Sequence, residues 1–141
     1  MRLYAFRMDQ RGAVAFEMPF ILGFILLALL FPLADVAVLG FQYISAQQAL
    51  RDFGQYALYH VPSDIGAPSW PAGATTISGY SISNIQVICG DPGSACTTNS
   101  TTIPKYYKFQ TSFSFTPLVL GPVMGCTGQC SYTLTYSERF Q

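Results

Sequence analysis

The sequence predicts an α+β protein in which one long N-terminal helix carries a small antiparallel β-sheet head with disulfides. Three observations lead to this fold class. An uncharged apolar run extends from Met18 to Ala34, and a helical pattern follows it until Pro62. The C-terminal half contains stretches in which apolar and polar side chains alternate, as they do in half-buried strands. All four cysteines lie in that same half, which indicates disulfide bonds in an oxidising compartment.

The composition separates a membrane part from a mildly acidic body. Half of the residues are hydrophobic and 10% are charged, whereas roughly a quarter is charged in typical soluble domains. The apolar excess lies in the first third of the chain. Three arginines precede Gly12, and after it six acids face four bases. Phosphate contacts need clustered lysine and arginine, so this body does not fit a nucleic-acid-binding protein.

We expect residues 1–12 to form a cytoplasmic leader and residues 13–60 to form one stem helix, membrane-spanning at about 18–40. The run from Met18 to Ala34 would extend about 26 Å as a helix, and a bilayer core is about 30 Å thick. It is longer than the roughly 7–15 apolar residues of a signal peptide, and no small-x-small cleavage site closes it. The arginines before it predict a cytoplasmic N-terminus.

The stem is expected to change character along its length. Pro19 and Pro32 each remove a backbone donor, so each should bend the helix locally. Beyond the apolar run, large apolar residues fall near one face at three- and four-residue steps, which predicts an amphipathic second half that lies against the head. These residues are Phe41, Ile44, Leu50, Phe53 and Ala57.

Residues 61–141 predict a β-rich extracytoplasmic head. The alternation is clearest over residues 105–116, where Tyr107 and Phe109 begin a series that points one way. Further strands are expected over residues 77–89, with a bulge near Asn84, and over residues 131–140. Lysines at 105 and 108 favour an edge strand. A sheet with one apolar face needs a cover, and the amphipathic half of the stem is the candidate in this sequence.

The cysteines favour disulfides over a metal site. Their spacings are C-x6-C and C-x3-C, neither of which is a C-x2-C zinc knuckle, and the single histidine, His60, is distant. No metal, no cofactor and no catalytic nucleophile with its base is expected, so the sequence predicts a protein that is not an enzyme. Four cysteines allow three pairings, of which two short loops are the simplest. The residues concerned are Cys89, Cys96, Cys126 and Cys130.

The most specific motif lies where the apolar run begins. An unpaired acid in lipid costs about 2.5–3.5 kcal/mol on insertion scales, so Glu17 calls for a partner. A basic leader, Gly12, four residues and then Glu17 resemble the processing site of type IV pilins and pseudopilins. With the apolar run and Asp35 behind it, the stretch most resembles the TadE-like minor pilins of tight-adherence (Tad/Flp) pili. The resemblance covers roughly residues 7–60, and the head matches no motif.

The resemblance implies a pilin-like fold and a set of site residues. A prepilin peptidase would cut between Gly12 and Ala13, where a residue without a side chain allows close approach. Glu17 would serve assembly by pairing with a neighbouring subunit's amine. Asp35 would be either a second register group or an acid at the membrane interface. The aromatic residues expected to pack the stem are Phe16, Phe20 and Phe24.

The function implied by the resemblance is that of a non-enzymatic minor pilin or pseudopilin. It would pack through its N-terminal helix into, or at the base or tip of, a Tad/Flp-type pilus and support assembly and surface adhesion. The implied partners are other pilin or pseudopilin subunits, the prepilin peptidase, the inner-membrane assembly platform and membrane lipid. The implied location is the bacterial inner membrane, single pass, with a periplasmic head that becomes extracellular in a pilus. The alternative is an uncleaved single-pass envelope protein whose disulfide-bonded head binds a protein or polymer.

Overall fold

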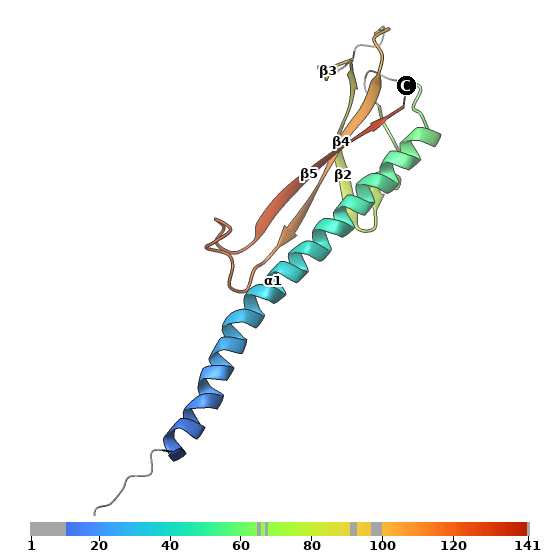
Figure 1. Ribbon diagram of the computed structural model, residues 1–141. Coiled ribbons are helices and arrows are strands. Elements are labelled where there is room, and N and C mark those ends of the chain that lie inside the picture. Colours follow the sequence, from blue (N-terminus) through green and yellow to red (C-terminus); the bar gives the residue numbers. More distant parts are fainter. Residues whose placement is uncertain (1–10, 65, 67, 91–92, 97–99, 141) are drawn as a thin grey trace, which may run out of the picture.

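The computed structural model describes residues 11–64, 66, 68–90, 93–96 and 100–140, and side chains from Glu17 onward. One helix, α1 (Arg11–Tyr59), projects far beyond a small sheet (Figure 1). The predicted combination of one long apolar helix, a small antiparallel sheet and two disulfides is confirmed. The first ten residues of the expected leader lie outside the described residues. The strands are β1 (Thr76–Ile77), β2 (Tyr80–Cys89), β3 (Ser94–Ala95), β4 (Lys105–Phe115) and β5 (Cys130–Arg139).

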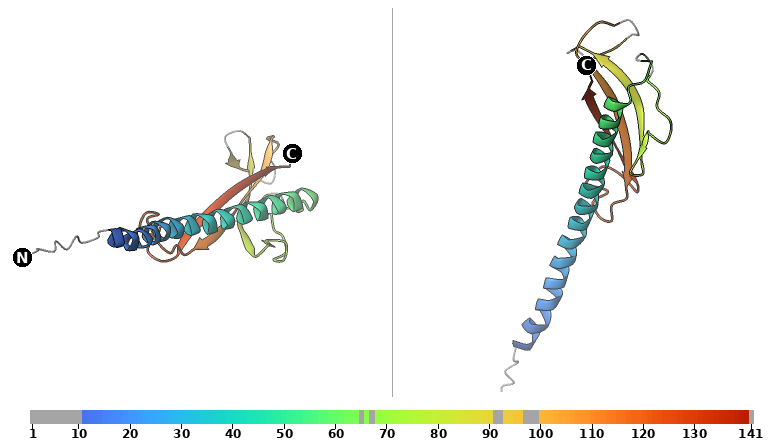
Figure 2. Two further views of the ribbon diagram at one scale, coloured as in Figure 1. Left: turned by 60° about the horizontal axis from the view of Figure 1, so that its bottom comes forward. Right: turned by 90° about the vertical axis from the view of Figure 1, so that its right-hand side faces the viewer.

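The helix α1 is continuous from the stem into the head. It runs through Pro19 and Pro32 without interruption and curves gently along its length (Figure 2). It ends at Tyr59, three residues before Pro62. The segment that follows is tied to the end of the helix, because the indole Nε1–H of Trp70 donates a hydrogen bond to the His60 carbonyl oxygen at 3.0 Å.

The sheet is antiparallel throughout, with the strand order β1-β2-β4-β5 and with β3 paired to β2. The strand β4 therefore lies between β2 and β5, and the predicted edge position was wrong. Lys108 points to the uncovered face of the sheet, where a central strand still meets water. A lysine on that face consequently does not indicate an edge.

The register follows the predicted alternation. β4 and β5 pair without a shift from Tyr106↔Arg139 to Phe115↔Cys130. The register between β2 and β4 shifts between Ser83 and Gln86, and Asn84 has a positive φ of 51°. This irregularity confirms the bulge predicted near Asn84.

The core lies between the second half of α1 and one face of the sheet. Phe53 is fully buried and makes edge-to-face contacts with Phe109 and Trp70, with ring centroids 4.8 Å and 5.3 Å apart. Gly54 is buried where a Cβ would lie 3.3 Å from the Glu138 carboxylate, so the glycine lets α1 approach β5 closely. Small and apolar residues of α1 complete this face: Ala46, Ala49, Leu50 and Ala57.

The phenol of Tyr107 is buried within this core. Tyr107 is fully buried against Trp70 and stacks on Phe140 at 4.0 Å between ring centroids. Its hydroxyl makes no hydrogen bond to any described residue. Burial raises the pKa of the Tyr107 phenol above its ordinary value, because the phenolate would be poorly solvated there.

Candidate membrane and assembly surface

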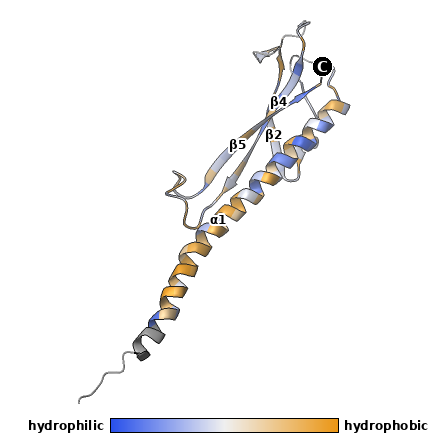
Figure 3. Cartoon of the chain, viewed as in Figure 1, coloured by the Kyte–Doolittle hydropathy of each residue, from blue (hydrophilic) through white to orange (hydrophobic). Residues whose placement is uncertain are grey.

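The first half of α1 is a bare apolar rod, which we call the bare stem and define as Glu17–Ala34. Its large apolar side chains from Met18 to Leu33 are between 44% and 73% exposed. In Figure 3, this part of the helix is coloured as hydrophobic over nearly its whole length below the head. A soluble monomer rarely exposes such a patch. Within the described part of the chain, this one helix is long and apolar enough to cross a membrane.

The bare stem gathers several of the predicted assembly residues on one side. Glu17 is exposed near its N-terminal end. Phe20 and Phe24 follow at three and seven residues, which places them on the same helical face, and each is 73% exposed. The backbone of Gly12, Ala13 and Phe16 lies in the first turns of α1, and their side chains are outside the described residues.

Asp35 marks the point at which the head begins to cover α1. Its side chain is 2% exposed. One carboxylate oxygen, Oδ1, accepts a hydrogen bond from the backbone N–H of Leu118 at 2.8 Å. The other, Oδ2, accepts from Val119 at 2.9 Å and Leu120 at 3.0 Å. Asp35 therefore ties α1 to the loop between β4 and β5, a role that neither interpretation of this residue from sequence had named.

The loop between β4 and β5, residues 116–129, is short of polar groups and compactly folded. It contains no charged side chain, and Leu118 and Val123 are strongly exposed. Gly121 is buried where a Cβ would lie 3.0 Å from the Cys126 carbonyl oxygen, so any side chain there would press on the backbone of the loop. The backbone N–H of Cys126 donates to the Gly121 carbonyl oxygen at 3.0 Å.

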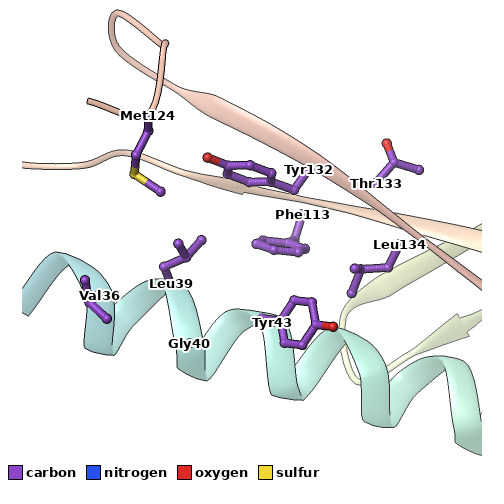
Figure 4. A pocket seen from close by; sticks show the side chains of 9 residues that line it. All are labelled: Val36, Leu39, Gly40, Tyr43, Phe113, Met124, Tyr132, Thr133 and Leu134. Carbon is purple, nitrogen blue, oxygen red and sulfur yellow. The ribbon is translucent and has the colours of Figure 1, made fainter. Parts of the chain in front are cut away.

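Two apolar hollows flank the place where this loop meets the helix. The larger, of about 430 Å³, lies between α1 and the sheet, and side chains from both sides point toward one another there (Figure 4). It is lined by Val36, Leu39, Gly40, Tyr43, Phe113, Met124, Tyr132, Thr133 and Leu134. The smaller, of about 240 Å³, lies where Val119 of the loop faces the bare stem. It is lined by Phe24, Leu27, Ala28, Phe31, Pro32 and Val119.

Sequence reasoning did not identify this loop as part of a surface. The signal was present in the run Pro117–Gly125, which is rich in apolar residues, although loops are ordinarily polar. The glycines and prolines in this run indicated a turn, so its apolar residues were not interpreted as part of a surface. The lining of the larger hollow comes from α1, β4, the loop between β4 and β5, and β5, so no local pattern could have indicated it.

The four cysteines form the two predicted disulfides. Cys89 pairs with Cys96, and Cys126 pairs with Cys130, with Cα atoms 5.4 Å and 5.7 Å apart. The second bridge closes the end of the β4–β5 loop where β5 begins. Among the described residues, no group of three or more histidine, cysteine or acidic side chains is arranged to hold a metal ion. No protein family, curated protein or solved structure matches the chain.

Proposed function

We propose that this protein is a non-enzymatic minor pilin or pseudopilin of the TadE-like kind. It would pack through α1 into, or at the base or tip of, a Tad/Flp-type pilus or a related secretion filament. The observation that carries the proposal is the division of α1 into a bare apolar stem and a half that forms the head's core. A filament subunit needs this division, because its stem must first be solvated by lipid and then be covered by neighbouring stems.

The charge distribution supports a role for Glu17 between molecules. The sequence has no lysine or arginine between Arg11 and Arg51. The cation that pairs with Glu17 must therefore come from the N-terminal segment or from another molecule. Cleavage after Gly12 would free the amine of Ala13, one helical turn from Glu17, with an ordinary pKa near about 7.7–8.0. Such a buried ion pair sets register more than it adds stability.

Removal of the leader also bears on the topology. The leader holds three of the chain's seven basic residues, and these would keep the N-terminus in the cytoplasm. The head would then be periplasmic in the inner membrane and extracellular in a pilus. Cleavage removes this charge and so lowers the electrostatic barrier to extracting the stem from the bilayer. The partners are other pilin or pseudopilin subunits, the prepilin peptidase and the assembly platform.

The N-terminus of the mature protein tests the cleavage. In cells with an active prepilin peptidase, mass spectrometry should find a chain that begins at Ala13. Gly12→Val should block the cut, because a branched side chain prevents close approach to the bond. Gly23→Val is the matched control, because a Cβ at Gly23 meets nothing within 4 Å, and it should be cleaved normally. An intact Met1 in the unmutated protein would refute the proposal and favour an uncleaved envelope protein.

The assembly role of Glu17 needs a separate experiment. Glu17→Ala should still enter the membrane and still be cleaved, but it should fail to join the filament, because it cannot pair with an incoming amine. The matched control is Asp52→Ala, which removes an exposed acid from the same helix within the head region. Immunoblots of sheared pili report incorporation. Normal incorporation of Glu17→Ala would remove the assembly role of this residue.

A further inference from the structure

The loop between β4 and β5 presents apolar side chains at the boundary between the bare stem and the head. Leu118 is 72% exposed, Val123 is exposed as well, and residues 116–129 contain no charge. We propose that this loop is a second membrane contact, which inserts Leu118 and Val119 into the outer surface of the bilayer beside the stem. The inference assumes that the stem spans the membrane and is independent of filament assembly.

The depth of the loop follows from the length of the bare stem. Glu17–Ala34 extends about 27 Å at roughly 1.5 Å per residue, close to the bilayer core of about 30 Å. With Glu17 at one edge of the core, Asp35 lies at the other edge. Val119 shares an apolar hollow with Phe31 and Pro32, about one helical turn inside that edge. The loop therefore reaches the depth at which hydrocarbon begins.

The N–H groups at the inserted positions already have acceptors within the protein. Irregular backbone enters a bilayer only where its polar groups are satisfied within the protein. The N–H groups of Leu118, Val119 and Leu120 are bonded to Asp35, and three further N–H groups are bonded to carbonyl oxygens of the same loop. Two positions in the loop are prolines, which have no N–H.

The same bonds explain why an acid is tolerated at this level. A carboxylate that accepts three N–H bonds is solvated by the protein and does not require water. Asp35 is thus compatible with the membrane edge. The alternative cover for the loop is a second copy of the chain. Lipid is favoured because the apolar surface of the loop is continuous with the apolar surface of the bare stem, which lipid must cover before any assembly.

Tryptophan quenching in lipid nanodiscs tests the contact. The full chain would be placed one copy per disc, in phosphatidylcholine with or without brominated acyl chains, which quench tryptophan at the depth of the hydrocarbon. Leu118→Trp reports on the loop. Ile103→Trp is the matched control, because Ile103 is 69% exposed on a loop at the opposite end of β4. The native Trp70 provides the background, and Phe24→Trp reports on the stem.

The expected result is that bromine quenches the added emission of Leu118→Trp and Phe24→Trp several-fold more than that of Ile103→Trp. Equal quenching of Leu118→Trp and Ile103→Trp would overturn the proposal. Quenching of Phe24→Trp without Leu118→Trp would overturn it while leaving the membrane span intact. Absence of quenching at Phe24→Trp would overturn the span and the loop contact together. If the emission of Leu118→Trp shifts to the blue only in discs that hold two copies of the chain, the loop contacts a second chain, and the proposed lipid contact is overturned.

Discussion

Two phenylalanines on the same helix should respond very differently to the same substitution. Phe53 is fully buried and touches Phe109 and Trp70 edge to face, whereas Phe24 is 73% exposed on the bare stem. Truncating a buried phenylalanine to alanine costs about 3–5 kcal/mol of folding free energy. A small domain has roughly 5–15 kcal/mol in total. Phe53→Ala should therefore remove much of the stability of the head.

Urea unfolding of the full chain in detergent micelles measures this difference. Trp70 reports on the core, because its ring centroid lies 5.4 Å from that of Tyr107 within the same cluster. With a urea slope of about 2 kcal/mol per molar, Phe53→Ala should lower the midpoint by roughly 2 M. Phe24→Ala removes the same atoms from an exposed site and should change the free energy of unfolding by less than about 0.5 kcal/mol.

Two results would refute this reasoning. Equal losses of stability for Phe24→Ala and Phe53→Ala would mean that the two halves of α1 do not have separate roles. A loss below about 1 kcal/mol for Phe53→Ala would mean that Phe53 is not in a packed core. Phe24→Ala should instead reduce retention in membranes or filaments, which fractionation of cells measures.

Three further outcomes are expected. Asp35→Ala should accelerate hydrogen exchange at the amides of residues 118–120 by an order of magnitude or more, because these N–H groups lose their acceptor. Unchanged exchange would contradict the three hydrogen bonds between Asp35 and the loop. The raised pKa of Tyr107 means that the fold favours the neutral phenol, so the head should keep its stability below about pH 10 and lose it as the pH rises further. Tyr107→Phe should reduce that alkaline loss in urea titrations without removing it, because burial raises the pKa of Tyr136 as well; a loss of equal size in this variant would assign it to another group. Replacing Cys126 and Cys130 by serine should loosen the β4–β5 loop and leave the unfolding midpoint of the sheet nearly unchanged, because the bridge closes only a very short loop; a collapse of the sheet would show that the bridge holds more than the loop.

Much of the fold could be predicted from the sequence because its signals are local. The three- and four-residue spacing indicated the buried face of α1 correctly at Leu50, Phe53 and Ala57. It was wrong for Phe41 and Ile44, which are 75% and 56% exposed because the sheet covers α1 closely only further along the helix. The two-residue alternation from Tyr107 to Phe115 indicated the inner face of β4. The bulge at Asn84 appeared as a slip in the alternation. The order of the strands could not be predicted from the two lysines. Lys105 is buried, and a solvent-facing lysine such as Lys108 is compatible with both central and edge positions in a one-sided sheet.

The candidate surface was predictable only in part. The apolar run and Glu17 are contiguous in sequence, so the bare stem could be expected. The hydrogen bonds of Asp35 to the β4–β5 loop could not be expected. The partners of Asp35 lie 83 to 85 residues away and are backbone N–H groups, which every residue except proline carries. Apolar residues in the loop acquire meaning only when the fold brings them to the end of the bare stem.

The unbroken course of α1 has a mechanical consequence. The bare stem and the helix in the head's core are one rod without a hinge, and Asp35 attaches the β4–β5 loop to it at the point of emergence. A twist applied to the stem must therefore turn the sheet with it. A force that pulls the stem along its axis acts to slide the packed face from Ala46 to Ala57 along the sheet, so the many small contacts of this face must break together. The head therefore does not rotate independently of the stem, and the orientation of the stem sets the orientation of the head.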